Sequence, residues 1–199
     1  MAKWIGDRIS TEDHEKSVTI VIFPLKTKWK EALLFAWILG FTFVGVTMLY
    51  LLINGVELLN APEGTTQEEL DSQRIYLIIF LGFWSYFEYK TVRSWMWYRF
   101  GKELLKIDTE GLTVKKSLFS YGKANKYLFE NIKKFGERKS DNTSFGQFFE
   151  NSYWSLGMDT IGFEYFGKSR TFGRRLDEKS ARLLIRFIDD RIKKMMKRR

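Results

Sequence analysis

The chain has 199 residues, a net charge of +9, no cysteine and a single histidine, His14. The absence of cysteine excludes disulfides, thiolate chemistry and cysteine-based metal sites. One histidine is too few for a multi-histidine zinc site or a histidine-based catalytic triad, and His14 lies in a polar run where we expect it to be solvated.

The positive charge is confined to the C-terminal half of the chain. Residues 1–98 contain 9 Lys/Arg and 11 Asp/Glu, whereas residues 99–199 contain 24 and 13. This asymmetry indicates contact with a polyanion, either anionic lipid or nucleic acid, although an ordinary basic surface would give the same pattern. We do not expect nucleic-acid binding, because the aromatic residues lie in apolar stripes rather than among the basic ones.

Residues 1–28 are predicted to form a cytoplasmic N-terminal arm with one short strand. Residues 1–16 are polar, whereas residues 17–25 (SVTIVIFPL) are β-branched and apolar up to Pro24. This strand either joins a soluble domain or lies at a membrane surface. Lysines at 26, 28 and 30 flank Trp29, as expected for anchors at the membrane–water interface.

Residues 32–53 form an uncharged apolar stretch. Its 22 residues would span ~33 Å as a helix, enough to cross a hydrocarbon core of ~30 Å. Thirteen of them are Leu, Ile, Phe or Val, and a buried helix of a soluble core rarely runs so long without a polar face. The stretch is also too long for a cleavable signal sequence, so it predicts a retained transmembrane helix.

A second, weaker apolar run occupies residues 75–87. Because 13 uncharged residues are short for a span, the helix must continue to about residue 97, past Glu88, Lys90 and Arg93. We predict a second transmembrane helix over 75–97 and hence a two-helix hairpin over residues 29–98; the alternative is an interfacial or re-entrant segment. The loop 54–73 has five acids and no Lys or Arg, so both termini are predicted to be cytoplasmic in a multi-pass protein.

Glu88 is the one carboxylate that would lie at membrane depth. An acid in this position is a candidate proton or ion site. The alternative is that Glu88 is interfacial or paired with an arginine, since neither helix holds a second acid or a histidine that could continue a relay.

Residues 99–199 predict a small α+β domain. Strands are expected at 103–108, 112–119, 124–132, 133–139, 160–165 and 169–172, and a polar loop at 142–152. Asp177 is a predicted N-cap for an amphipathic C-terminal helix, whose apolar stripe would cap an antiparallel sheet or barrel. The stripe consists of Ala181, Leu184, Ile185, Ile188, Ile192 and Met195.

The segment IGFEYFGKSRTFGRRLDEKSARLLI, with IVIFPLKTKW before the first helix and FGKELLKIDTEGLTVKK after the second, resembles bacterial membrane proteins that carry a cytoplasmic pleckstrin-homology-like (PH-like) domain. The positions that fit the family's closing hairpin and helix are Phe163, Tyr165, Gly167, Phe172, Gly173, Leu176, Ala181 and Ile185. The resemblance implies a PH-like fold and an adaptor role in the bacterial inner membrane, with no catalytic residues to carry over.

Two basic groups are candidate sites for anionic lipid headgroups. One surrounds the second predicted hairpin, and the other is the C-terminal tail, whose charge could instead complement the helix dipole. They comprise Lys115, Lys116, Lys123 and Lys126 in the first, and Lys193, Lys194, Lys197, Arg198 and Arg199 in the second. No catalytic motif, cofactor motif or metal site is recognised.

The function expected from the sequence is a non-enzymatic, membrane-anchored PH-like adaptor. It would bind a protein partner and anionic lipid, and a homo-oligomer is left open. The alternative is a subunit of an oligomeric transport or channel assembly that uses Glu88.

Overall fold

The computed structural model describes residues 3–55, 66–138 and 155–197. The chain divides into two compact units. One combines Met1–Lys26 with Met96–Arg199, and the other is Thr27–Trp95. The predicted loop at 142–152 and the tail residues Arg198 and Arg199 lie outside the described residues.

The second unit consists of the helix α1 (Lys28–Asn54) and most of the helix α2 (Gln67–Phe100). α2 begins eight residues before the predicted start at 75, because Thr66 and Glu69 form a capping box. The Thr66 N–H donates to Glu69 Oε2 at 2.9 Å, and the Glu69 N–H donates to Thr66 Oγ1 at 3.3 Å. This cap lets a charged first turn join the apolar helix that follows.

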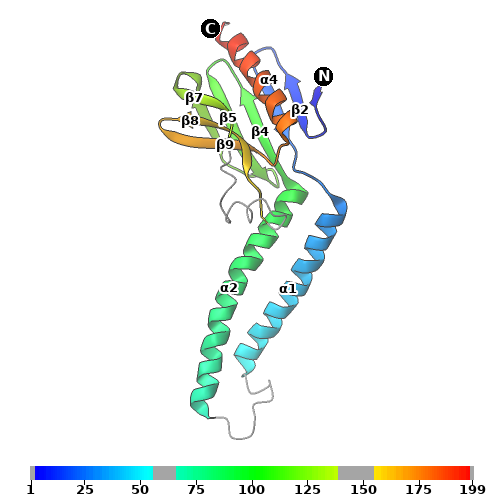
Figure 1. Ribbon diagram of the computed structural model, residues 1–199, viewed down its shortest axis with the longest axis vertical. Helices are drawn as coiled ribbons and strands as arrows, with labels where there is room; N and C mark the ends of the chain where they lie inside the picture. The colour runs from blue at the N-terminus through cyan, green and yellow to red at the C-terminus, as the bar shows by residue number, and fades with distance from the viewer. Residues whose placement is uncertain (1–2, 56–65, 139–154, 198–199) are drawn as a thin grey trace. The chain divides into compact units, whose positions relative to one another are not determined.

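α1 and α2 run antiparallel (Figure 1). The ring centres of Phe35 and Trp95 are 5.2 Å apart, and those of Phe41 and Trp84 are 5.3 Å apart. Residues later in α1 thus contact residues earlier in α2, as antiparallel helices require. Gly45 makes the closest approach, since a Cβ there would lie 2.1 Å from the Trp84 ring. Aromatic rings from both helices therefore pack along the pair.

The first unit contains a six-stranded antiparallel sheet with its strands in chain order. The chain leaves the sheet after β3 and returns to it at β4, after residues 23–100. These two strands are hydrogen-bonded neighbours, with Ile20 opposite Leu105. The strands are β1 (Lys3–Ile5), β2 (Ile9–Asp13), β3 (Val18–Ile22), β4 (Gly101–Ile107), β5 (Gly111–Leu118) and β6 (Ala124–Leu128).

β3 is the strand predicted in the N-terminal arm, but the arm holds two more. Ile9 and Thr11 of β2 are buried, so this polar segment contributes to the core instead of being a free arm. β1 and β2 were not predicted, because β1 has only three residues and β2 is mainly polar. The predicted hairpin at 103–119 is confirmed as β4 and β5.

A three-stranded sheet and a helix complete the unit. The sheet is β7 (Ile132–Glu137), β8 (Asp159–Tyr165) and β9 (Lys168–Arg174), preceded by the 3₁₀ helix η2 (Phe129–Asn131), which shortens the strand predicted at 124–132. The C-terminal helix is α4 (Glu178–Met196), and its predicted cap is confirmed: Asp177 accepts from the Ser180 N–H at 2.9 Å.

One hydrophobic core joins the two sheets to α4, which crosses them in Figure 1. The predicted stripe of α4 supplies four fully buried residues, Ala181, Leu184, Ile188 and Met195. The class is therefore α+β, as predicted, with antiparallel sheets covered by one amphipathic helix. Its central buried strand residues are Ile9, Ile20, Leu105, Leu112, Ile161 and Phe172.

The N-terminal strands should be essential for the β unit. We expect Ile20→Asp to lower the free energy of unfolding by more than about 3 kcal/mol, because it buries an unpaired charge. Thr19→Asp, on the half-buried opposite face of the same strand, should change it by less than about 1 kcal/mol. Thermal unfolding and trypsin resistance of the full-length variants would be measured, and a β4–β5 region that stays protected in Ile20→Asp would contradict the pairing.

Candidate functional site

In the part of the chain that the structure describes, α1 is the one helix long and apolar enough to cross a membrane by length and composition. Only 17% of its most apolar 18-residue stretch is buried. Large apolar side chains along it, among them Trp37, Phe43, Val46 and Ile53, are exposed. α2 is longer but more charged and does not meet the same criterion.

Glu88 of α2 forms a polar contact with α1. The Thr42 hydroxyl of α1 donates to Glu88 Oε1 at 2.6 Å. The other carboxylate oxygen, Oε2, is buried and has no hydrogen-bond partner among the residues that the structure describes, and the same is true of Trp84 Nε1 one helical turn away. Within the described residues the partner of Glu88 is thus a threonine and not an arginine.

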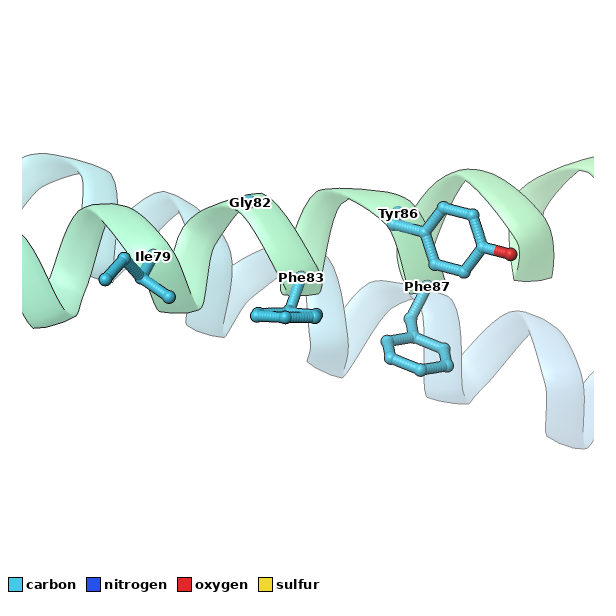
Figure 2. Close-up of a pocket in the computed structure, with 5 residues that line it drawn as sticks. All are labelled: Ile79, Gly82, Phe83, Tyr86 and Phe87. Atoms are coloured by element: carbon cyan, nitrogen blue, oxygen red, sulfur yellow. The ribbon is translucent and has the colours of Figure 1, made fainter.

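A shallow apolar groove of about 520 Å³ follows one face of α2 (Figure 2). Its lining residues recur at helical spacing, and Gly82 leaves a notch among aromatic rings. The Tyr86 hydroxyl is the one polar side-chain group among them, so the groove suits a hydrocarbon chain rather than a polar ligand. The lining comprises Ile79, Gly82, Phe83, Tyr86 and Phe87.

The four lysines of the predicted hairpin site are dispersed. Lys116 forms an ion pair with Asp159, and Lys126 with Glu110, at 2.7 Å. Lys115 donates to the Ser120 carbonyl at 3.1 Å, whereas Lys123 is exposed in the β5–β6 connection. The structure therefore does not assemble these lysines into one phosphate pocket.

The C-terminal basic residues Lys193, Lys194 and Lys197 are exposed on the last turns of α4. An adjacent cavity of about 260 Å³ is lined by both acids and bases, and Arg191 pairs with Asp13 at 2.5 Å. Asp13, the last residue of β2, thus neutralises part of the charge at this end of the helix. The cavity lining is Asp13, His14, Glu15, Arg191, Lys194 and Met195.

Sequence analysis missed a buried carboxylate, Glu103 of β4. Its side chain is 1% exposed and accepts from the N–H groups of Gly173 at 2.7 Å and Arg174 at 2.9 Å. Gly173 has φ +77°, so β9 leaves regular strand geometry here and its N–H groups need other acceptors. Burial, together with the nearby Asp159, raises the pKa of Glu103.

Arg8, in the turn between β1 and β2, binds the carbonyl groups of the same segment. It donates to the carbonyls of Arg175 at 2.6 Å and Arg174 at 3.1 Å, and also to that of Phe23 at 3.0 Å. Burial lowers the pKa of this guanidinium. Arg8 and Glu103 thus hold the N–H and C=O groups of one irregular strand end, and we call this pair the Arg8–Glu103 clamp.

Asp159 of β8 forms a second charged contact between the sheets. It pairs with Lys116 of β5, accepts from the Thr171 hydroxyl at 2.7 Å and lies 3.4 Å from Arg174 Nε. Although burial acts to raise it, the pKa of Asp159 is lowered by Lys116 and then by Arg174 and Thr171. The guanidinium of Arg174 also lies 4.6 Å from the centre of the Trp97 ring.

These charged groups all contact other protein groups, so the cluster is suited to joining the sheets. One signal of it is visible in the sequence: Glu103 occupies an inward position of a strand whose other inward residues are Gly101, Leu105 and Ile107. Among the described residues, no group of three or more His, Asp or Glu side chains could hold a metal ion.

Comparison with protein-family models, with curated proteins and with solved structures gave no match for this chain. Its function is therefore inferred from its own residues.

Removing one acceptor from the clamp should weaken the fold. Glu103→Gln keeps the side-chain size but offers one acceptor oxygen instead of two, so we expect the free energy of unfolding to fall by about 1–3 kcal/mol. Glu110→Gln, which alters an exposed carboxylate paired with Lys126, is the control and should cost less than about 1 kcal/mol. Unfolding followed by tryptophan fluorescence would measure both, and equal effects would contradict the role of Glu103.

The same pair of proteins gives a pH test. Because folding raises the pKa of Glu103, the folded chain retains a proton that the unfolded chain releases between the ordinary and the raised pKa. Stability from Glu103 is therefore lost as the pH rises through this window. The stability difference between the native chain and Glu103→Gln should shrink accordingly when unfolding is measured across this pH window.

Proposed function

We propose that this chain is a membrane-anchored binding module of the bacterial cytoplasmic membrane. In this proposal α1 and α2 are a two-span hairpin, and the β unit is a PH-like adaptor on the cytoplasmic side that recruits a protein partner. The observation that carries the proposal is the exposed apolar surface of α1. Removing apolar surface from water is favourable by about 25 cal/mol of free energy per Å². Lipid is the medium that would cover the surface of a helix of this length.

The side chains of α2 support its assignment as the second span. Ile75, Ile78, Ile79, Phe80 and Phe83 are all exposed, as lipid-facing residues would be. Towards its cytoplasmic end, Lys90 Nζ lies 5.4 Å from the centre of the Tyr86 ring. A lysine near the end of a span can keep its apolar stem in the hydrocarbon layer and extend its ammonium group to the headgroup region.

The order of elements in the β unit supports the PH-like part of the proposal. Four consecutive antiparallel strands, β3 to β6, are followed by three more and then by a C-terminal amphipathic helix. β1 and β2 are additions at one edge. The charged cluster inside the unit joins its sheets, which leaves its strand edges and the outer face of α4 as binding surfaces.

Reporter fusions test both the spans and their direction. An alkaline phosphatase fused after the C-terminus should be inactive, and one fused after Gly55 should be active, because the enzyme needs the extracytoplasmic side to fold. Alkaline extraction of membranes should leave the chain in the pellet. A highly active C-terminal fusion would rule out the two-span topology, and release by alkali would rule out membrane embedding.

The buried, unpartnered Oε2 of Glu88 favours a second candidate function, a subunit of an oligomeric transport or channel assembly. A carboxylate with a vacant acceptor at membrane depth could bind a proton or a cation.

Glu88→Gln separates the two functions. Glutamine can still accept from Thr42 but cannot ionise, so the adaptor proposal predicts unchanged insertion and a free energy of unfolding within about 1 kcal/mol of the native value. Ion or proton flux through proteoliposomes, followed with a pH-sensitive dye, should be absent from both proteins. Flux in the native chain that is lost in Glu88→Gln but kept in Thr42→Val would establish the transport function instead.

A further inference from the structure

The turn between β5 and β6 presents two aromatic side chains to solvent. The Leu118 N–H donates to the Tyr121 carbonyl at 2.8 Å, and the Tyr121 N–H donates to the Leu118 carbonyl at 2.9 Å. These two hydrogen bonds close a two-residue turn of Phe119 and Ser120. Tyr121 is 83% exposed and Phe119 is 47% exposed. Apolar rings at the end of a hairpin contribute nothing to the core of the unit.

The backbone of this turn is unfavourable for the residues it holds. Phe119 has φ +50° and Ser120 has φ +71°, the signs of a type I′ turn, which favours Asn-Gly. A bulky residue with positive φ is strained, so the geometry of the turn does not account for a phenylalanine at this position. Folding alone would therefore select a different residue at 119.

A third ring extends the exposed surface. Phe100, the last residue of α2, has its ring 4.3 Å from that of Phe119 and is itself exposed. We call Phe100, Phe119 and Tyr121 the aromatic tip. Lys115 reaches the turn through the Ser120 carbonyl, and the exposed Lys123 follows Tyr121 by two residues.

The aromatic tip lies at the end of the sheet where the chain enters and leaves the helices. Gly101, which follows α2 directly, pairs with Leu118, and Ile22, which precedes α1, pairs with Glu103 on the same end of β4. The β8–β9 turn lies at the opposite end of its sheet. Its Phe166 is 71% exposed, whereas the far end of β9 contacts Trp97 in the last turn of α2.

We infer that the aromatic tip inserts into the interfacial layer of the bilayer that holds α1 and α2, while Lys115 and Lys123 contact anionic lipid phosphates. Aromatic rings prefer this layer, and lysines near it are attracted to anionic headgroups. The inference rests on the proposed membrane embedding. It adds a third attachment point, besides the two chain connections, which would hold the β unit against the leaflet.

Single-cysteine labelling of the full chain can test this, because the native sequence has no cysteine. Nitroxides would be placed by Ser120→Cys in the turn, Val44→Cys in α1 and Phe166→Cys as the exposed control. The probes are vesicles of phosphatidylcholine with or without phosphatidylglycerol. Collision rates with oxygen, which concentrates in lipid, and with a water-soluble nickel chelate report the depth of each label.

We expect the label at 44 to lie deep in the bilayer and the label at 166 to be aqueous. The label at 120 should be interfacial, with a ratio of oxygen to nickel collision rates several-fold higher than that at 166. An aqueous label at 120 with a deep label at 44 would overturn the inference and leave the proposed embedding intact. An aqueous label at 44 would overturn the embedding itself. Equal depth at 120 in neutral and anionic vesicles would overturn the role given to Lys115 and Lys123.

A second variant separates insertion from a structural role. Phe119→Asn with Tyr121→Ser, in the Ser120→Cys background, places a residue that favours positive φ at position 119. We expect its melting temperature to stay equal or rise while the label at 120 moves into water. A lower melting temperature with an unchanged label depth would show that the rings serve the fold and not the membrane.

Discussion

The Arg8–Glu103 clamp fixes the strand end on which the packing of the β unit depends. β9 leaves regular geometry at Gly173, so two N–H groups and two C=O groups there lie beyond the hydrogen bonding of their own sheet. Glu103 satisfies the donors and Arg8 the acceptors, each from the six-stranded sheet. Polar groups left unpaired inside a protein cost roughly 1–3 kcal/mol each, so the clamp joins the sheets while removing that cost. Its position just before Asp177 also sets where α4 can begin and hence how its apolar stripe meets both sheets.

A second constraint comes from the connectivity of the large sheet. β3 and β4 are neighbours although the whole of α1 and α2 lies between them in the chain. Adjacent strands lie about 4.8 Å apart, so the polypeptide leaves and re-enters the β unit at nearly the same place. The aromatic tip is at this end, where β5 pairs with the first residue after α2. The chain connections to α1 and α2 and the exposed rings of the aromatic tip are thus at the same end of the six-stranded sheet.

Regular patterns made much of this fold predictable. Alternating apolar residues located β3, β4, β5 and β8, and a cap with a helical stripe located α4. β1 and β2 could not be recognised, because strands this short and polar are stabilised by their neighbours and not by their own composition. The predicted phosphate site at the β5–β6 hairpin does not form, because lysines that are close in the chain have different partners in the fold. Lys116, for example, pairs with Asp159. The Arg8–Glu103 clamp joins residues far apart in sequence, so composition could indicate an unusual acid but not its partners. Membrane embedding, the PH-like likeness and the adaptor role remain predictions.

The separation of β3 from β4 has a consequence for biogenesis. If α1 and α2 span a membrane as proposed, β1, β2 and β3 are synthesised before β4, and one edge of β3 lacks its partner strand while the helices insert. A single crossing would leave β3 and β4 on opposite sides of the bilayer, so the two strands could not pair in a chain with only one span inserted. Completion of the sheet, with burial of Ile20 against Leu105, would then distinguish a complete hairpin from a chain with a single span inserted. Chains that insert wrongly would keep exposed strand edges, the surface that quality-control proteases and chaperones recognise.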